Sequence, residues 1–152
     1  MNSLSFKTKF GWISVFEENN RIIRVKFGKN KNKSISRNLK SIKSNLNFFL
    51  NKKSKKIRGN FTIQGNSIQK KVWKELTKIK LGKTKSYGEI AKKFNLSPRH
   101  VGKICGQNKM LLLIPCHRVI RSDGSIGGFT SKGGINLKKK LLYFEKEFKN
   151  KY

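Results

Sequence analysis

The stretch that organises this chain is MLLLIPCHRVI, residues 110–120. It carries one cysteine, Cys116, at a bend that Pro115 fixes, because proline locks φ and lacks a backbone N–H donor. Most buried cysteines behave as small apolar side chains, and a core strand with an inert thiol is one interpretation of the stretch. However, His117 and Arg118 follow directly, and nearby positive charge lowers the pKa of a thiol toward the reactive thiolate. The pattern therefore favours a cysteine that acts as a nucleophile.

The charge of the chain favours a polyanionic partner. Its 152 residues include 37 Lys and Arg against 7 Asp and Glu, which gives a net charge of +30. That much positive charge repels itself in the compact state and attracts nucleic acid. Because lysine, asparagine and isoleucine are abundant throughout, the charge does not indicate where the nucleic acid binds. The length suffices for one compact domain or two small ones.

Cysteine usage and hydropathy indicate a cytoplasmic protein. The two cysteines, Cys105 and Cys116, are too few for the disulfide framework of a small secreted domain. Residues 1–12 contain no apolar segment of a signal peptide. No apolar run approaches the roughly 20 residues that a membrane span needs. We therefore expect no association with a membrane.

The first part of the chain, residues 1–60, predicts a small α+β scaffold domain. Residues 11–16 and 22–27 flank two asparagines that suit a hairpin turn. Apolar residues between positions 35 and 49 then recur at steps of four and three, which predicts a helix. The basic residues 52–59 are interpreted as a linker, although a basic arm that contacts phosphate is the alternative.

The remainder, residues 61–152, predicts a mostly helical domain. Ser67 is a candidate N-cap for a helix that ends before Gly82. Ser86 and Glu89 have the spacing of a capping box at the start of a second helix.

Ser97 and Pro98 then restart a helix, with proline at its first position. Two short helices around a tight turn form a helix-turn-helix, a motif that aims the beginning of its second helix at DNA. Here that beginning includes Pro98 and Arg99.

A glycine-rich segment, residues 127–134, includes Phe129 and Thr130. Glycines usually mark a loop, but they also let the backbone approach a flat ligand closely. The chain ends in a predicted helix over residues 136–148, and Glu145 lies at the edge of its apolar stripe.

Residues 114–119, IPCHRV, resemble the active-site motif of the O6-alkylguanine-DNA alkyltransferases, also called methylated-DNA–protein-cysteine methyltransferases. The resemblance extends over residues 61–148. It implies DNA repair by irreversible, single-turnover transfer of the methyl group of O6-methylguanine to Cys116. A thiolate suits this chemistry because it attacks saturated carbon well. The resemblance further implies a monomer that flips the base out of double-stranded DNA, enters the minor groove and reads little sequence.

The resemblance also implies the catalytic roles. Cys116 matches the alkyl acceptor, His117 the relay imidazole, and Glu145 the acid that orients this imidazole. Asn108 matches the residue that supports the active-site turn, and Tyr87 the residue that helps to rotate the nucleotide and protonates guanine O6. Neighbouring side chains point to opposite faces of extended backbone, so we expect a bridging water to carry the proton from Cys116 to His117.

The remaining matched positions form two groups. Arg99 matches the arginine finger that fills the gap left by the flipped base, and the DNA contacts are expected to be Arg99, Tyr87, Pro98 and Arg118. The substrate pocket is expected to contain Ile114, Pro115, Phe129 and Thr130. Phe129 stands where the family often has tyrosine, so a hydroxyl contact to the base is lost. No zinc ligands are apparent in the first domain, and we expect neither a metal nor a cofactor.

Two other classes of protein fit parts of the sequence. A non-catalytic damage-binding protein or helix-turn-helix regulator explains the charge and residues 86–106, but it leaves Cys116 without a function. A cysteine hydrolase would use Cys116 and His117, yet adjacent residues have poor geometry for a direct dyad. We therefore favour the alkyltransferase.

Overall fold

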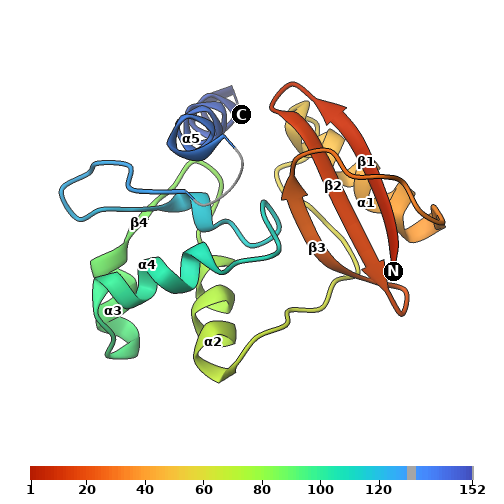
Figure 1. Ribbon diagram of the computed structural model, residues 1–152. Coiled ribbons are helices and arrows are strands. Elements are labelled where there is room, and N and C mark those ends of the chain that lie inside the picture. Colours follow the sequence, from red (N-terminus) through yellow and green to blue (C-terminus); the bar gives the residue numbers. More distant parts are fainter. Residues whose placement is uncertain (130–132, 152) are drawn as a thin grey trace. The chain divides into compact units, whose positions relative to one another are not determined.

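The computed structural model describes residues 1–129 and 133–151, apart from the side chain of residue 151. Contacts divide the chain into two compact units (Figure 1). The first contains Met1–Gln64 and Lys109–Leu113, and the second contains Gly65–Asn108 and Ile114–Tyr152. The sequence, in contrast, predicts a single division after residue 60. The antiparallel strands of the first unit and the helices of the second confirm the α+β class.

The first unit is a three-stranded antiparallel sheet covered on one face by a helix. The strands β1 (Asn2–Thr8), β2 (Gly11–Glu18) and β3 (Arg21–Phe27) are neighbours in chain order. The helix α1 (Arg37–Leu50) packs against all three. The sequence predicts only the β2–β3 hairpin, because β1 carries just two apolar residues.

Two local features fix this arrangement. Asn19 and Asn20, between β2 and β3, have φ values of 51° and 62°, the left-handed conformation that a two-residue hairpin turn requires. At the start of α1, the Ser36 hydroxyl accepts a hydrogen bond from the N–H of Leu39 at 3.1 Å, which satisfies a free donor of the first turn. The buried face of the helix consists of Leu39, Ile42, Leu46, Phe49 and Leu50.

The apolar run before Cys116 is divided between the units. Val25 in β3 donates its N–H to the carbonyl of Lys109 at 2.9 Å and accepts from the N–H of Leu111 at 3.1 Å. Residues 109–113 therefore extend the sheet of the first unit, whereas Ile114 and the following residues belong to the second. Because the run is apolar throughout, its sequence does not show where the chain passes from the first unit to the second.

The second unit begins with α2 (Ser67–Leu76). The prediction that Ser67 caps this helix is wrong. Asn66 is the N-cap: its side chain accepts from the N–H of Gln69, and the Gln69 side chain accepts from the N–H of Asn66, both at 2.9 Å. The helix also ends earlier than predicted, although Ile79 beyond it is still buried.

The predicted helix-turn-helix is confirmed. It consists of α3 (Tyr87–Phe94) and α4 (Pro98–Gly106), joined by a turn in which Asn95 has a φ of 55°. Ser86 and Ser97 accept hydrogen bonds from backbone N–H groups at 3.0 and 3.1 Å and cap the two helices. The short strand β4 (Lys85–Ser86) pairs in parallel with β5 (Val119–Ile120). This pairing brings the start of α3 beside the segment that follows Cys116.

The last helix, α5 (Gly134–Lys151), is longer than the predicted range of 136–148. Its buried side includes the expected apolar residues Leu137, Leu141, Phe144 and Phe148. Lys138 and Glu145 are each only 1% exposed and lie on this side as well. In the part of the chain that the structure describes, no helix is both long enough and apolar enough to cross a membrane.

Candidate active site

Cys116 opens a single turn of 3-10 helix, η1 (Cys116–Arg118). Pro115 precedes the turn, and its carbonyl accepts a hydrogen bond from the N–H of Arg118 at 3.0 Å. The carbonyl of Ile114 accepts from the N–H of Cys116 at 2.8 Å and from the Asn108 amide at 2.9 Å. Asn108 therefore holds the entry to the turn, and the backbone at Cys116 is bent rather than extended.

Behind the turn lies a buried charged cluster. His117 Nε2 is 2.8 Å from Glu145 Oε2, and Arg118 donates Nε to Oε1 at 2.7 Å and Nη2 to Oε2 at 2.9 Å. Burial by itself would raise the pKa of Glu145. The charges and hydrogen bonds of His117 and Arg118 outweigh it and lower the pKa to about 2. Glu145 is therefore a carboxylate that orients His117 and Arg118, the two residues that follow Cys116.

Arg118 has a different environment from the one expected for a DNA contact. It is 9% exposed, and its third hydrogen bond, from Nη1, goes to the carbonyl of Ile79 at 2.6 Å. A guanidinium paired with a buried carboxylate is costly to withdraw. Arg118 thus fits the support of Glu145 better than the binding of phosphate.

The Cys116 thiol is itself buried, with 5% of the residue exposed. Burial raises the pKa of this thiol, against the opposing effects of the Asn108 side chain and the Lys138 ammonium. The charges of His117 and Arg118 are expected from the sequence to lower the thiol pKa, but His117 acts on it through a backbone hydrogen bond, and the charge that lowers it is that of Lys138. Lys138, which sequence reasoning missed, is the cation whose charge acts on the thiol.

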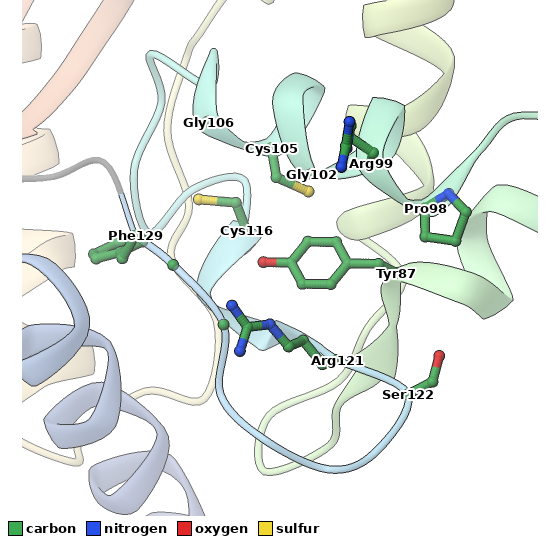
Figure 2. Close-up of a pocket in the computed structure, with 12 residues that line it drawn as sticks. Tyr87, Pro98, Arg99, Gly102, Cys105, Gly106, Cys116, Arg121, Ser122 and Phe129 are labelled. Atoms are coloured by element: carbon green, nitrogen blue, oxygen red, sulfur yellow. The ribbon is translucent and has the colours of Figure 1, made fainter.

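Cys116 faces a cavity of about 840 Å³ within the second unit (Figure 2). Tyr87 projects into this cavity from the start of α3. Gly127 has a φ of 75°, and a Cβ placed there would lie 3.2–3.3 Å from the Tyr87 ring and hydroxyl. Glycine thus permits close contact between this loop and the ring. Other side chains that line the cavity are Pro98, Arg99, Cys105, Arg121 and Phe129.

Lys138 forms a hydrogen bond with Tyr87 inside the second unit. Its Nζ donates to the Tyr87 hydroxyl at 3.2 Å and to the carbonyls of Val119 and Gly128 at 2.7 and 3.2 Å. Burial, together with the nearby thiols, raises the pKa of Tyr87 to about 12. The Tyr87 hydroxyl therefore remains protonated at neutral pH and can act as a donor. Burial lowers the pKa of Lys138, an effect that the thiols oppose.

The comparisons with known proteins agree with this site. Residues 67–147 match the family described as 6-O-methylguanine DNA methyltransferase, DNA binding domain. A methylated-DNA–protein-cysteine methyltransferase of Metallosphaera sedula is 34% identical over 144 residues, which cover 93% of this chain and 90% of the relative. The chain belongs to this family. This methyltransferase repairs DNA by transferring an alkyl group to a cysteine of the protein, and the resemblance seen in residues 114–119 is confirmed.

Solved structures of related methyltransferases match the fold of nearly the whole chain. The crystal structure of Mycobacterium tuberculosis OGT in complex with DNA matches 97% of this chain and 94% of its own, with a TM-score of 0.85 and 26% identity. An O6-methylguanine DNA methyltransferase from Methanococcus jannaschii matches 94% of this chain and 93% of its own, with a TM-score of 0.70 and 28% identity. DNA is therefore the partner of this methyltransferase.

Most of the predicted site residues of this methyltransferase gather in the second unit. Cys116, Tyr87, Pro98, Arg99 and Phe129 line the cavity, whereas His117, Glu145, Asn108, Ile114 and Pro115 lie at or behind the turn. Thr130 lies outside the described residues. Among the described residues, no three His, Cys, Asp or Glu side chains are grouped so that they could hold a metal ion.

Three residues of the site were not identified from the sequence: Cys105, Arg121 and Lys138. Cys105 and Arg121 line the cavity, but they precede and follow the matched motif without belonging to it. Lys138 lies seven residues before Glu145, two helical turns away, and therefore on the same face of α5. A lysine on the buried side of a helix is the signal that could have identified it.

Proposed function

We propose that Cys116 is the residue that accepts the alkyl group, and that the substrate is O6-methylguanine in double-stranded DNA. The observation that carries this proposal is the shared cavity. It brings together the Cys116 thiol, the Tyr87 hydroxyl and the start of the second helix of a helix-turn-helix. A nucleophile, a proton donor and a DNA-binding element are the three components that alkyl transfer from a base requires.

Access to the cavity requires the base to leave the duplex. A stacked base presents no methyl group to a buried thiol, so we propose that the nucleotide is flipped into the cavity. Arg99 supports this step, because it is exposed in the first turn of α4 at the rim of the cavity. It would fill the space left in the base stack, with α4 in the minor groove. Pro98 would contact the DNA beside it.

Inside the cavity, the base would lie between Tyr87, Phe129 and the backbone of the glycine-rich loop. A cavity of about 840 Å³ is within the range of sites that enclose small ligands. Thr130 is proposed as a further wall residue from the family match alone. Phe129 offers an aromatic face without a hydroxyl, so it would contribute stacking rather than a hydrogen bond.

Activation of the thiol would occur after the base has entered. Burial raises the pKa of Cys116, so the thiol must give its proton to a nearby base. The Nε2 of His117 is engaged by Glu145, which leaves Nδ1 as the atom that receives the proton through a bridging water. The Lys138 ammonium would stabilise the resulting thiolate.

The transfer step is balanced by the groups in the cavity. The Cys116 sulfur forms a bond to the methyl carbon while the bond between this carbon and guanine O6 breaks, and the electron pair remains on the base. Tyr87 donates a proton to the base, and Lys138 compensates the charge on the Tyr87 oxygen. The thiol proton passes to His117 and the proton on the base comes from Tyr87, so one proton is lost and one is gained, and the opposite charges left on His117 and Tyr87 balance. The product is a thioether, so each molecule would react once.

Intact mass spectrometry after mixing the protein with excess duplex containing one O6-methylguanine tests the proposal. We expect a mass increase of one methyl group in place of one hydrogen, which stops at one per protein and maps to Cys116. Cys105 is the matched control, since its thiol lines the same cavity. Cys105→Ala should still accept a methyl group and Cys116→Ser should not. A methyl group on Cys105, or an unchanged mass with retained DNA binding, contradicts the proposal.

We further propose that the protein acts as a monomer in the cytoplasm. Both cysteines are free and buried, and a reducing compartment keeps an acceptor thiol available. A site formed entirely by the second unit of one chain requires no second copy. Light scattering coupled to size-exclusion chromatography, with and without DNA, tests the monomer.

A further inference from the structure

The sheet of the first unit has a second face that α1 does not cover. On the covered face, Phe6 pairs with Ile13 and Val15 with Val25, and the Lys43 ammonium of α1 lies 5.9 Å from the centre of the Phe6 ring. Side chains alternate along a strand. The opposite face therefore carries the intervening residues, which on β2 are Trp12, Ser14 and Phe16. Their neighbours on β1 and β3 are Ser3, Ser5, Lys7, Arg24 and Lys26.

A basic loop, residues 28–33, crosses this face and is fixed there by serines. The Ser14 hydroxyl donates to the carbonyl of Gly28 at 2.6 Å, and the Ser5 hydroxyl donates to the carbonyl of Asn30 at 2.8 Å. The Ser3 hydroxyl donates to the carbonyl of Lys31 at 2.8 Å. All three serines are buried. The position of the loop, and hence of its lysines, is therefore determined by specific contacts and is not a by-product of a lysine-rich composition.

The loop and β3 place ammonium groups over the two aromatic rings. Lys29 Nζ lies 4.6 Å from the centre of the Trp12 ring, and Lys26 Nζ lies 5.7 Å from the centre of the Phe16 ring. Trp12 and Phe16 are both partly exposed. Since they are four residues apart on one strand, their Cα atoms are separated by about 13 Å. This face thus presents two aromatic rings, one on each side of the basic loop, and each ring lies next to an ammonium group.

In the first unit only one exposed carboxylate, that of Glu18 at the end of β2, opposes this charge, and its cross-strand neighbour is Arg21. In residues 1–64 the only carboxylates are those of Glu17 and Glu18. Glu17 is 3% exposed and accepts a hydrogen bond from the Asn2 amide at 3.0 Å. Exposed aromatic rings beside lysines are the surface that unpaired nucleotides recognise, because bases stack on the rings and phosphates pair with the ammonium groups. Bases of an intact duplex are stacked on one another and offer no such contact.

We propose that this face of the sheet, comprising Trp12, Phe16, Lys26 and Lys29, binds single-stranded DNA. On binding, a base takes the exposed face of each ring, and the ammonium that lay over the ring moves to the adjacent phosphate. The surface lies wholly within the first unit, so this activity is separate from alkyl transfer at Cys116. It gives the protein a means of attachment to unpaired strands that depends neither on damage nor on sequence.

Titration of the full-length protein with undamaged oligo(dT) tests this proposal through tryptophan fluorescence. The chain has two tryptophans. Trp73 is 3% exposed and donates its indole N–H to the carbonyl of Ile104 at 3.0 Å, so a stacking base reaches only Trp12. We expect quenching that saturates with binding and disappears in Trp12→Leu. Anisotropy of labelled oligo(dT) should show about tenfold weaker binding for Trp12→Leu and for Phe16→Leu, in line with the loss of one stacked base.

Phe48→Leu is the matched control, because Phe48 is also exposed in the first unit but belongs to α1. It should leave both signals unchanged. All three variants should react with a free O6-alkylguanine base at the rate of the unaltered protein, which shows that they are folded and separates this test from that of the acceptor. Binding without quenching, equal effects of the three substitutions, or quenching by anionic lipid vesicles but not by oligo(dT) would overturn the proposal.

Discussion

The Lys138 ammonium lies 3.2 Å from the Tyr87 hydroxyl oxygen and 5.5 Å from the centre of the same ring. A buried lysine from the last helix therefore contacts the residue proposed to protonate the leaving base. Its charge also favours the thiolate of Cys116, against the burial that raises the thiol pKa. One cation thus acts on both ends of the proposed reaction.

Replacing this lysine should change the pH dependence of transfer. In Lys138→Met the thiol pKa rises further, so the rise of the rate with pH should move up by about one unit, which is about tenfold in rate at neutral pH. The measurement is the single-turnover rate with a free O6-alkylguanine base as a function of pH. Lys138→Arg should retain most of the original profile. A rate that falls equally at every pH would instead indicate a purely structural role.

Glu145→Gln should destabilise the second unit strongly, because it leaves the buried Arg118 guanidinium without its counter-charge. Removal of one partner of a buried ion pair costs about 3–5 kcal/mol. Glu147→Gln, two residues further along the same helix and exposed, should cost much less. Urea unfolding at neutral pH measures both. Similar losses in the two variants would contradict the importance of the buried cluster.

The lowered pKa of Glu145 predicts how the free energy of unfolding depends on pH. Its pKa is about 2 in the folded protein against an ordinary value of 4.5, so the folded state favours the ionised form. This contribution, about 3 kcal/mol, is fully present above pH 4.5. It declines as the pH falls below this value and is lost below pH 2. Urea unfolding as a function of pH should show this decline in the unaltered protein and a weaker one in Glu145→Gln.

Arg99→Ala should slow repair of O6-methylguanine in duplex DNA by about tenfold, because no side chain then occupies the space that the flipped base leaves in the stack. Reaction with the free alkylated base, which needs no flipping, should be unaffected. Lys103→Ala is the control: Lys103 is exposed in the last turn of α4, and its loss removes the same charge. If both substrates slow equally in Arg99→Ala, the residue does not act as a finger.

Asn66→Ala should lower the free energy of unfolding by about 1 kcal/mol, as expected for loss of an N-cap. Ser67→Ala, at the position that the sequence pattern favours, should have an effect close to zero. Thermal or urea unfolding of the two variants distinguishes the caps. The reverse order would mean that α2 begins one residue later in solution.

Local signals account for much of what the sequence predicts. Asparagines with positive φ mark the β2–β3 turn, and Ser97 with Pro98 marks the start of α4, since each acts on its immediate neighbours. Pro115 likewise indicates the bend that presents Cys116. These features depend on bonds within a few residues, so one sequence suffices to identify them.

Features that depend on distant partners were missed or misassigned. Lys138 resembles any other of the 37 basic residues until Tyr87 and the carbonyls of Val119 and Gly128 surround it. Arg118 looks like a cation available to DNA until Glu145 is found beside it. The spacing of residues along the chain does not locate these partners, because the fold brings them together from α5, from β5 and from a loop.

Residues 109–113 have a consequence for attempts to divide this protein. A fragment ending at residue 64 would lack the segment that bonds to Val25 and would expose one edge of β3. An unpaired strand edge is a template for aggregation. A fragment starting at residue 65 would carry apolar residues 110–113 without the sheet that they extend. Each unit contains two separate segments of the chain, so dividing the chain at one position yields neither unit intact. The methyltransferase should therefore be expressed, and its unfolding measured, as the whole chain.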